Sequence, residues 1–249
     1  MKICVIASLV LILVCGGSAA FAEVAGGGYN WTGFYAGLNL GSAINDSSYR
    51  LSPTGNYYGD PNNSLRTDSG DFNSAAFTGG GQLGYNYQIC SWVLGLETDF
   101  NYNGVEESQF VSRALTSPLL GDFNHSVTQK TDFFGTVRGR VGYTPCNRWM
   151  IYATGGFAYG HVASNSNLLF TEAGDHYAAS STNVQAGWTV GGGAEYALSR
   201  CWSVKLEYLF IDLGSNSYTY GNQLFPGFTY TTQLDTSEHV VRVGVNYKF

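Results

Sequence analysis

The final eleven residues of the chain, 239–249, alternate between apolar and polar side chains. One face carries Val241, Val243, Val245, Tyr247 and Phe249, and the other carries Arg242, Gly244, Asn246 and Lys248. A period of two is the side-chain period of a β-strand. An apolar face that ends in aromatic rings, opposite a charged face, is typical of a membrane barrel, whose strands face lipid outside and a polar lumen inside. This segment alone also fits a terminal strand of a soluble β-domain.

The same alternation recurs along the chain and predicts seven further strands. We expect them at residues 32–43, 74–88, 92–103, 130–144, 149–162, 184–198 and 202–213. Longer polar segments separate some of these strands, at 44–73, 104–129, 163–183 and 214–236, and short turns separate the others. Long and short connections therefore alternate, which is the pattern of outer-membrane barrels. The sequence predicts an all-β fold: an eight-stranded antiparallel transmembrane β-barrel with four long outer loops and three short periplasmic turns.

Composition supports the membrane interpretation of these strands. Aromatic residues make up 15% of the chain, charged residues only 12%, and there are 33 glycines. Trp92, Trp149 and Trp202 each follow a short turn, where they would form a periplasmic aromatic girdle. A soluble lipocalin-type barrel would place the apolar face inside, and periodicity alone does not decide between the two. A net charge of −6 argues against a nucleic-acid partner.

The first 22 residues have the features of a secretory signal peptide. Lys2 is followed by an apolar run from Ile3 to Cys15 and by the small-x-small sequence Ala20-Phe21-Ala22. The run is too short for a transmembrane helix. We therefore expect a signal peptide at 1–22 and an outer-membrane β-barrel domain at 23–249. Lipidation at Cys15 is disfavoured, because Val14 stands where a small residue is expected.

Four motifs resemble a known family. They are WTGFYAGLNLG (31–41), YATGGFAYG (152–160), GGGAEYALSRCWSVKLEYLFIDLG (191–214) and RVGVNYKF (242–249). Together they resemble the small outer-membrane β-barrels called "porin family" or opacity-type proteins, similar in architecture to the barrel of outer-membrane protein A. The resemblance implies an integral protein of the outer membrane of a Gram-negative bacterium. It also implies that Tyr247 and Phe249 act as an assembly signal, read by the barrel assembly machinery.

The polar faces of the predicted strands bring many charges into the lumen. An eight-stranded barrel is only wide enough for side chains to fill it, and buried charges are unstable unless they pair. We therefore expect these residues to form a salt-bridge plug, and a gated or narrow conduction path is the alternative. The set is Glu97, Asp99, Arg138, Arg140, Glu195, Lys205, Glu207, Arg242 and Lys248.

Three cysteines lie outside the predicted signal peptide. Cys90, Cys146 and Cys201 each fall in a different short turn, so we expect three thiols at the periplasmic rim. The periplasm is oxidising, and three is an odd number, so at least one thiol lacks an intramolecular partner. Free thiols, one internal bridge and disulfide-linked oligomers all remain open.

Other chemistry finds little support in the sequence. The histidines at 125, 161, 176 and 239 do not belong to a recognisable nucleophile–base–orienter set. The acidic and amide residues of 44–73 lack calcium-loop spacing. The glycine triplets 79–81 and 191–193 lie within strands and indicate close packing or bending. We expect no catalytic residues, no metal site, no cofactor and no enzymatic activity.

These observations predict a structural role that supports the cell envelope, combined with surface interaction through exposed loops. The alternative is a small or narrow porin-type channel for passive solute transport. The expected partners are outer-membrane lipid and lipopolysaccharide, the barrel assembly machinery, and host or surface ligands that bind the loops; nucleic acid is not expected.

Overall fold

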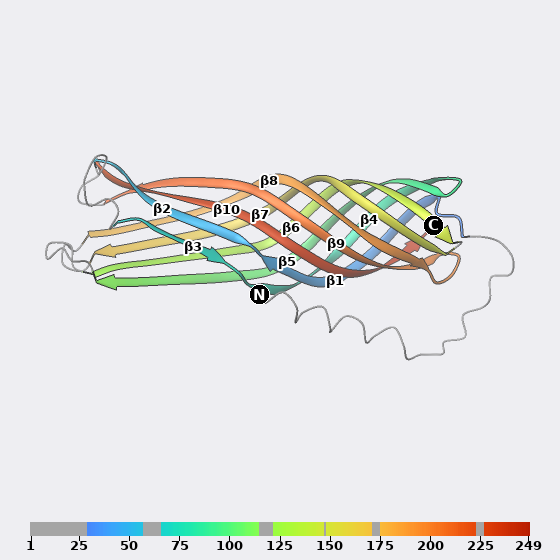
Figure 1. Cartoon of the computed structure of the whole chain (residues 1–249), viewed down its shortest axis with the longest axis horizontal. Coiled ribbons are helices and arrows are strands. Elements are labelled where there is room, and N and C mark those ends of the chain that lie inside the picture. The colour runs from blue at the N-terminus through green and yellow to red at the C-terminus, as the bar shows by residue number, and fades with distance from the viewer. Residues whose placement is uncertain (1–28, 57–65, 115–121, 147, 171–174, 223–226) are drawn as a thin grey trace.

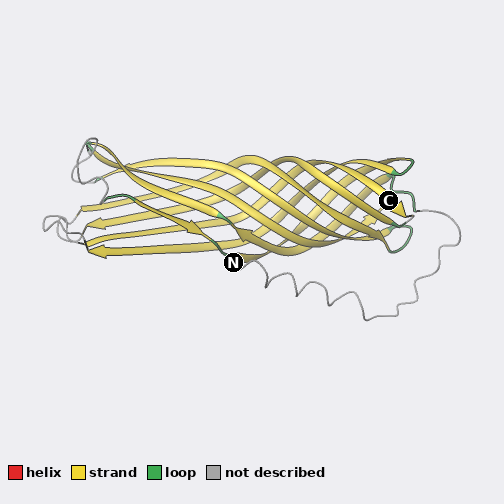
Figure 2. Ribbon diagram, viewed as in Figure 1, coloured by secondary structure: helices red, strands yellow, loops and turns green. Residues whose placement is uncertain are grey.

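The computed structural model describes residues 29–56, 66–114, 122–146, 148–170, 175–222 and 227–249. The predicted signal peptide lies outside these ranges. Ten strands make up nearly all of the described chain (Figure 2). They are β1 (Gly33–Asn45), β2 (Ser47–Gly55), β3 (Asp68–Phe72), β4 (Ala75–Ile89), β5 (Trp92–Ala114), β6 (Asp122–Cys146), β7 (Trp149–Phe170), β8 (Asp175–Ala197), β9 (Trp202–Gly221) and β10 (Phe228–Lys248). No helix among these residues is long and apolar enough to span a membrane.

The strands form one closed antiparallel ring (Figure 1). Neighbours in sequence pair from β4 to β10, and β1 pairs with both β4 and β10, which closes the barrel. β1 and β2 follow one another along the same side of β10. In the same way β3, which pairs with β2, leads into β4, which pairs with β1. The ten strands therefore make eight strands of the barrel wall, two of which are interrupted. The predicted eight-stranded barrel is confirmed.

The outward face of the barrel is apolar. Leu38, Leu83, Leu96, Val137 and Ile151 are all exposed on it. Exposed aliphatic side chains over so wide a band are stable against lipid and unfavourable against water. The face assignment made from the sequence, with aliphatic residues outside and charges inside, is therefore correct.

Aromatic pairs border this aliphatic band at both ends. Near the short turns, the rings of Trp92 and Tyr143 lie 5.3 Å apart and those of Trp202 and Tyr247 lie 5.0 Å apart. This is the girdle that the sequence predicted. The opposite border carries a second row of aromatic residues, which includes the Phe100–Phe133 pair with ring centres 5.1 Å apart. The sequence had not predicted this second row. Two aromatic girdles mark the two membrane interfaces.

The segments expected to be long loops are largely strand, and this is a correction. β5 continues to Ala114 and β6 starts at Asp122, so strand occupies most of 104–129; β2 and β3 likewise fall within 44–73. Water lies outside these strand extensions, and most of their outward side chains are polar, with Phe110 and Leu169 as exposed exceptions. Their inward side chains mix polar residues with an apolar core. The pattern of an apolar outer face and a polar inner face is therefore lost, and the segments have the composition of loops.

Beyond the membrane band the ring separates into two facing sheets. The β8–β9 ladder stops at Trp188↔Asp212, and the β4–β5 ladder stops at Thr78↔Asn103. Among the described residues, the outer parts of β3, β2, β10 and β9 form one sheet, and those of β5, β6, β7 and β8 form the other. Side chains of both sheets share an apolar core that contains Leu51, Phe123, Leu168, Phe170, Tyr177, Tyr220 and Tyr230. The outer half is therefore a filled β-sandwich.

Irregularities in the ladders mark this change of architecture. Register shifts occur between Tyr102 and Val105, between Thr131 and Phe133, and between Asp235 and Ser237. Each interrupts a long strand where the outer sandwich begins. β-Bulges bend a strand and re-aim its side chains, so these shifts let continuous strands serve a barrel at one end and a sandwich at the other.

Candidate functional site

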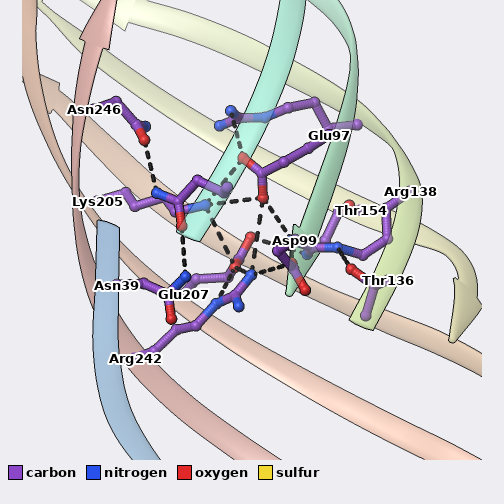
Figure 3. A network of polar contacts seen from close by, with 12 residues as sticks. Asn39, Glu97, Asp99, Thr136, Arg138, Thr154, Lys205, Glu207, Arg242 and Asn246 are labelled. Atoms are coloured by element: carbon purple, nitrogen blue, oxygen red, sulfur yellow. Dashed lines mark hydrogen bonds and ion pairs between the residues drawn. The ribbon is translucent and has the colours of Figure 1, made fainter. Parts of the chain in front are cut away.

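Charged side chains fill the lumen at the level of the membrane. Arg138 of β6 is fully buried, and one of its nitrogens, Nη2, lies 2.5 Å from Glu97 Oε1 and 2.8 Å from Asp99 Oδ2. Its other terminal nitrogen, Nη1, lies 3.1 Å from Glu207 Oε1. The guanidinium therefore crosses the lumen between β5 and β9. Figure 3 shows these carboxylates converging on it. The guanidinium is planar and has five N–H donors, so it can bind three carboxylates at once better than a lysine ammonium can.

Two more cations complete this cluster (Figure 3). Arg242 of β10 places Nη2 at 2.6 Å from Glu207 Oε2 and at 2.8 Å from Asp99 Oδ2. Lys205 Nζ lies 2.9 Å from Glu97 Oε1. Each carboxylate thus faces at least two cations, because side chains from four strands meet at one level.

Arg140 forms a second layer nearer the short turns. Its Nη2 lies 2.8 Å from Glu195 Oε2, and its Nη1 donates to the Tyr35 hydroxyl at 3.1 Å. The guanidinium carbon lies 3.9 Å from the centre of the Tyr152 ring, a cation–π contact. The Tyr35 hydroxyl in turn donates to Glu97 at 2.8 Å, which joins this layer to the main cluster.

The two layers together balance their charge. Four acids, Glu97, Asp99, Glu195 and Glu207, face four bases, Arg138, Arg140, Lys205 and Arg242, and all eight are buried. The structure therefore brings together eight of the nine residues that the sequence assigned to the lumen network.

Lys248 is the exception, and its assignment to the network was wrong. The side chain is only partly buried and lies at the end of the barrel. Its Nζ lies 4.4 Å from the centre of the Tyr29 ring and donates to the Asn30 carbonyl oxygen. Alternation correctly gives the face of Lys248, but that face is open to solvent at the end of the barrel. None of the described carboxylates forms an ion pair with it.

Apolar side chains close the lumen below the charged layers. Trp31 is 2% exposed and packs with Val93, Met150, Tyr152 and Ala197. Tyr29 covers this cluster, with its ring 4.6 Å from that of Trp31. The segment that leads into β1 thus folds into the end of the barrel, which the sequence did not predict.

A buried chain of hydrogen bonds around His125, in the outer sandwich, is a polar site that the sequence did not predict. His125 Nδ1 lies 2.6 Å from Asp68 Oδ2, and its Nε2 lies 3.0 Å from Ser166 Oγ. The Ser166 hydroxyl also lies 2.9 Å from the Tyr220 hydroxyl. Asp68 and Tyr220 belong to one sheet, whereas His125 and Ser166 belong to the other. We call these four residues the inter-sheet clasp.

The clasp has the order of groups found in serine hydrolases, namely carboxylate, imidazole and hydroxyl. However, the Ser166 side chain is completely buried and its hydroxyl is already shared by His125 and Tyr220. The arrangement therefore joins two sheets whose edges are not paired. Sequence could not reveal it, since Asp68 and His125 are 57 positions apart and meet only through strand pairing.

We expect the clasp to depend on the ionisation of Asp68. Burial raises the pKa of Asp68, but hydrogen bonds with His125 and Tyr49 outweigh this effect and leave the pKa below its ordinary value. A lowered folded-state pKa stabilises the clasp above about pH 4 and loses that contribution as the pH falls further. Asp68→Asn should therefore reduce amide-exchange protection in β3 at neutral pH, by roughly thirtyfold for about 2 kcal/mol.

The matched control for this prediction is Asp71→Asn, because Asp71 is exposed on the outer face of the same strand. Its exchange pattern should match that of the wild type. In Asp68→Asn, acidification should cause little further loss of protection. Equal protection of β3 in both variants at neutral pH would contradict the role of Asp68.

The three cysteines lie at the short-turn end of the barrel, as expected. Cys90 is in the β4–β5 turn, Cys146 ends β6, and Cys201 precedes β9; all three are free thiols. The first two turns are in contact, because the Thr144 amide donates to the Ser91 carbonyl at 2.8 Å. Cys90 also has a φ of 55°, a left-handed value that is uncommon for a non-glycine residue. Whether any pair oxidises stays a prediction.

The proposed assembly signal lies on the lipid-facing row of β10. Tyr247 and Phe249 are exposed, and their rings are 5.4 Å apart. The Phe249 amide donates to the Phe34 carbonyl at 3.0 Å, which holds the end of the chain against β1. Their recognition by the assembly machinery stays a prediction.

Comparisons with known proteins agree with this geometry. The family model for the outer membrane protein beta-barrel domain matches residues 7–249. The 31 kDa outer-membrane immunogenic protein of Brucella melitensis is 39% identical over 225 residues, which are 89% of this chain and 85% of that protein. The 22 kDa outer membrane protein of Rhizobium leguminosarum is 32% identical over 184 residues, 72% of each chain. These names describe outer-membrane proteins and no enzymatic activity.

A solved structure has the same fold. The outer membrane protein OprG of Pseudomonas aeruginosa matches with a TM-score of 0.52 and 12% identity, over 89% of this chain and 98% of that one. At this identity the match concerns the fold alone. The family match, the lipid-facing band and the filled lumen lead to one conclusion: the chain belongs to the outer membrane protein β-barrel family and resides in the bacterial outer membrane.

Proposed function

We propose that this protein is a closed structural barrel of the cell envelope, which carries its outer β-sandwich as a surface for interaction. The observation that carries the proposal is the charge-balanced network of the lumen, in which buried arginines span from strand to strand. A network of this kind stiffens a barrel and leaves little room for solutes. The Trp31 cluster supports the same view, because it covers the network at one end.

The outer sandwich is the part that would meet the cell's surroundings. The strands there carry polar outward side chains, as in Ser108, Thr128 and Lys130. Two Brucella relatives are named as immunogenic outer-membrane proteins. Recognition by antibodies requires accessible surface, and this chain would offer it on the outer faces of the sandwich. Lipopolysaccharide beside the band, the barrel assembly machinery and host or surface ligands are the partners that fit the proposal.

Ion conductance in a planar lipid bilayer tests whether the lumen is closed. The wild-type barrel should give no stable current steps. Arg140→Ala should produce a measurable leak, because Arg140 of β6 reaches Tyr35 on β1 and Glu195 on β8. Arg200→Ala is the matched control, since that arginine is exposed in the β8–β9 turn, and it should remain silent. Stable steps in the wild type would overturn the proposal and favour the narrow porin-type channel.

A further inference from the structure

Glu238 is a buried acid that the lumen network does not use. It lies on the inner face of β10, between the charged layers and the outer sandwich, and is 1% exposed. The Asn103 side-chain amide donates to its Oε2 at 2.7 Å. Its other oxygen, Oε1, has no hydrogen-bond partner among the described residues, and no ion pair in that part of the chain includes it. Glu238 is therefore a carboxylate without a counter-charge.

The walls around Glu238 make this arrangement costly. Its cross-strand neighbour on β9 is Ile211, which is fully buried, and Val105 and Val240 are fully buried in the same core. Apolar walls cannot solvate a charge, and an unpaired buried carboxylate is strongly disfavoured. A positive ion or a proton must therefore balance Glu238.

Three oxygen atoms, at this level or at the next one outward, also lack partners among the described residues. Asn103 binds Glu238 through its nitrogen, which leaves Asn103 Oδ1 free. The Thr131 hydroxyl lies close to the same carboxylate but outside hydrogen-bonding geometry. Gln129, two residues before Thr131, donates to Thr236 at 3.2 Å and leaves Gln129 Oε1 free. Each of these three side chains is completely buried.

One donor in this layer also has no partner in the part of the chain that the structure describes. It is the amide nitrogen of Asn45, the cross-strand neighbour of Glu238 on β1. The oxygen of that amide already accepts a hydrogen bond from Ser47 at 2.5 Å. The free groups are otherwise one carboxylate oxygen, two amide oxygens and a hydroxyl, all from β5, β6 and β10.

We propose that Glu238, Asn103, Gln129 and Thr131 form a binding site for a monovalent hard cation such as sodium or potassium. Oxygen donors of these types suit hard cations and not soft metals. The charge favours a monovalent ion, because Glu238 is the one carboxylate among these four donors. The next inward carboxylate, Glu107, is the cross-strand neighbour of Gln129 on β5. Its Oε1 accepts a hydrogen bond from Gln109, and its Oε2 has no partner among the described residues. The site does not depend on the proposed function, since it lies outside the charged layers.

The test compares unfolding in sodium chloride, potassium chloride and choline chloride at equal ionic strength. The full barrel is refolded from urea into neutral phosphatidylcholine vesicles in each salt, so that entry of the ion does not limit binding. A cation at ten times its dissociation constant favours the folded state by roughly tenfold. The wild-type equilibrium constant for unfolding should therefore be about tenfold lower in sodium or potassium than in choline, and Glu238→Gln should abolish this difference.

Glu106→Gln is the matched control, because Glu106 is exposed on the outer face of β5. It should keep the wild-type response to salt. Equal unfolding of the wild type in all three salts would overturn the proposal and indicate a protonated carboxyl with water. A full salt response in Glu238→Gln would also overturn it.

A direct measurement covers the case in which Glu238→Gln does not fold. Crystals of the wild-type protein soaked in rubidium or thallium(I) should show a peak in the anomalous difference map within coordination distance of Glu238 Oε1. The absence of such a peak, at concentrations that label other cation sites, would reject the site.

Discussion

Replacing Arg138 with alanine should destabilise the barrel by about 3 to 5 kcal/mol, the usual cost of removing one partner from a buried ion pair. Arg138 contacts Glu97, Asp99 and Glu207 at 2.5, 2.8 and 3.1 Å. Without it, four buried acids face three bases, and one carboxylate keeps a charge that neither water nor protein balances. Urea unfolding of the refolded barrel in lipid vesicles measures this change.

Two further variants separate charge from packing. Arg200→Ala removes an exposed arginine and should change the unfolding free energy by no more than about 0.5 kcal/mol. Asp99→Asn combined with Arg138→Ala restores three acids against three bases. The double variant should therefore be more stable than Arg138→Ala alone. If Arg138→Ala unfolds like Arg200→Ala, the lumen network does not support the barrel.

Alanine at Gly80 should cost about 1 to 3 kcal/mol, the range for overpacking a filled interior. Gly80 faces the lumen on β4, and a Cβ there would overlap the Phe100 carbonyl oxygen and lie 2.7 Å from the Asn101 Cα. Both are backbone atoms of β5, so no side chain can move aside and the strand itself must shift. Within the triplet 79–81, for which the sequence indicated close packing or bending, Gly80 therefore serves close packing. Urea unfolding reports this loss as well.

The neighbouring residue is a matched control within the same triplet. Gly81 faces lipid, where a Cβ would lie 3.7 Å from the Gly37 carbonyl oxygen, an ordinary contact. Gly81→Ala should be neutral or stabilise by about 0.4 to 1 kcal/mol, because alanine restricts the unfolded chain. Equal effects at both positions would show that loss of glycine flexibility, and not close packing, sets the cost.

Much of the membrane part of this protein could be predicted from sequence. In a barrel wall, one face meets lipid and the other meets a polar lumen, so each strand has a two-residue period with a large contrast between faces. That contrast located the eight strands of the barrel wall, the short turns and the network residues Glu97, Arg138 and Arg242. It also placed Lys248 on the correct face but could not show that this face is open at the barrel end.

The outer half was harder to predict because water replaces lipid there. β5 and β6 continue well beyond the predicted strand ends, to Ala114 and from Asp122, with mostly polar residues on their outer faces. An exposed polar strand and an exposed loop have similar compositions, and the contrast between faces is lost. The split into two sheets depends on which ladders stop, as at Trp188↔Asp212, and this is decided by the bulges and the shared core.

Within the membrane band, the sequence by itself determined which acids and bases point inward, since alternation fixes the face of each residue of a strand. Only the tertiary structure decided which of them meet. Asp68 reaches His125 across 57 positions, and Asn103 reaches Glu238 across 135. The physical reason is that a barrel brings side chains together through the registers of its strands around a closed ring. Those registers follow from the packing of the whole wall and not from any local pattern.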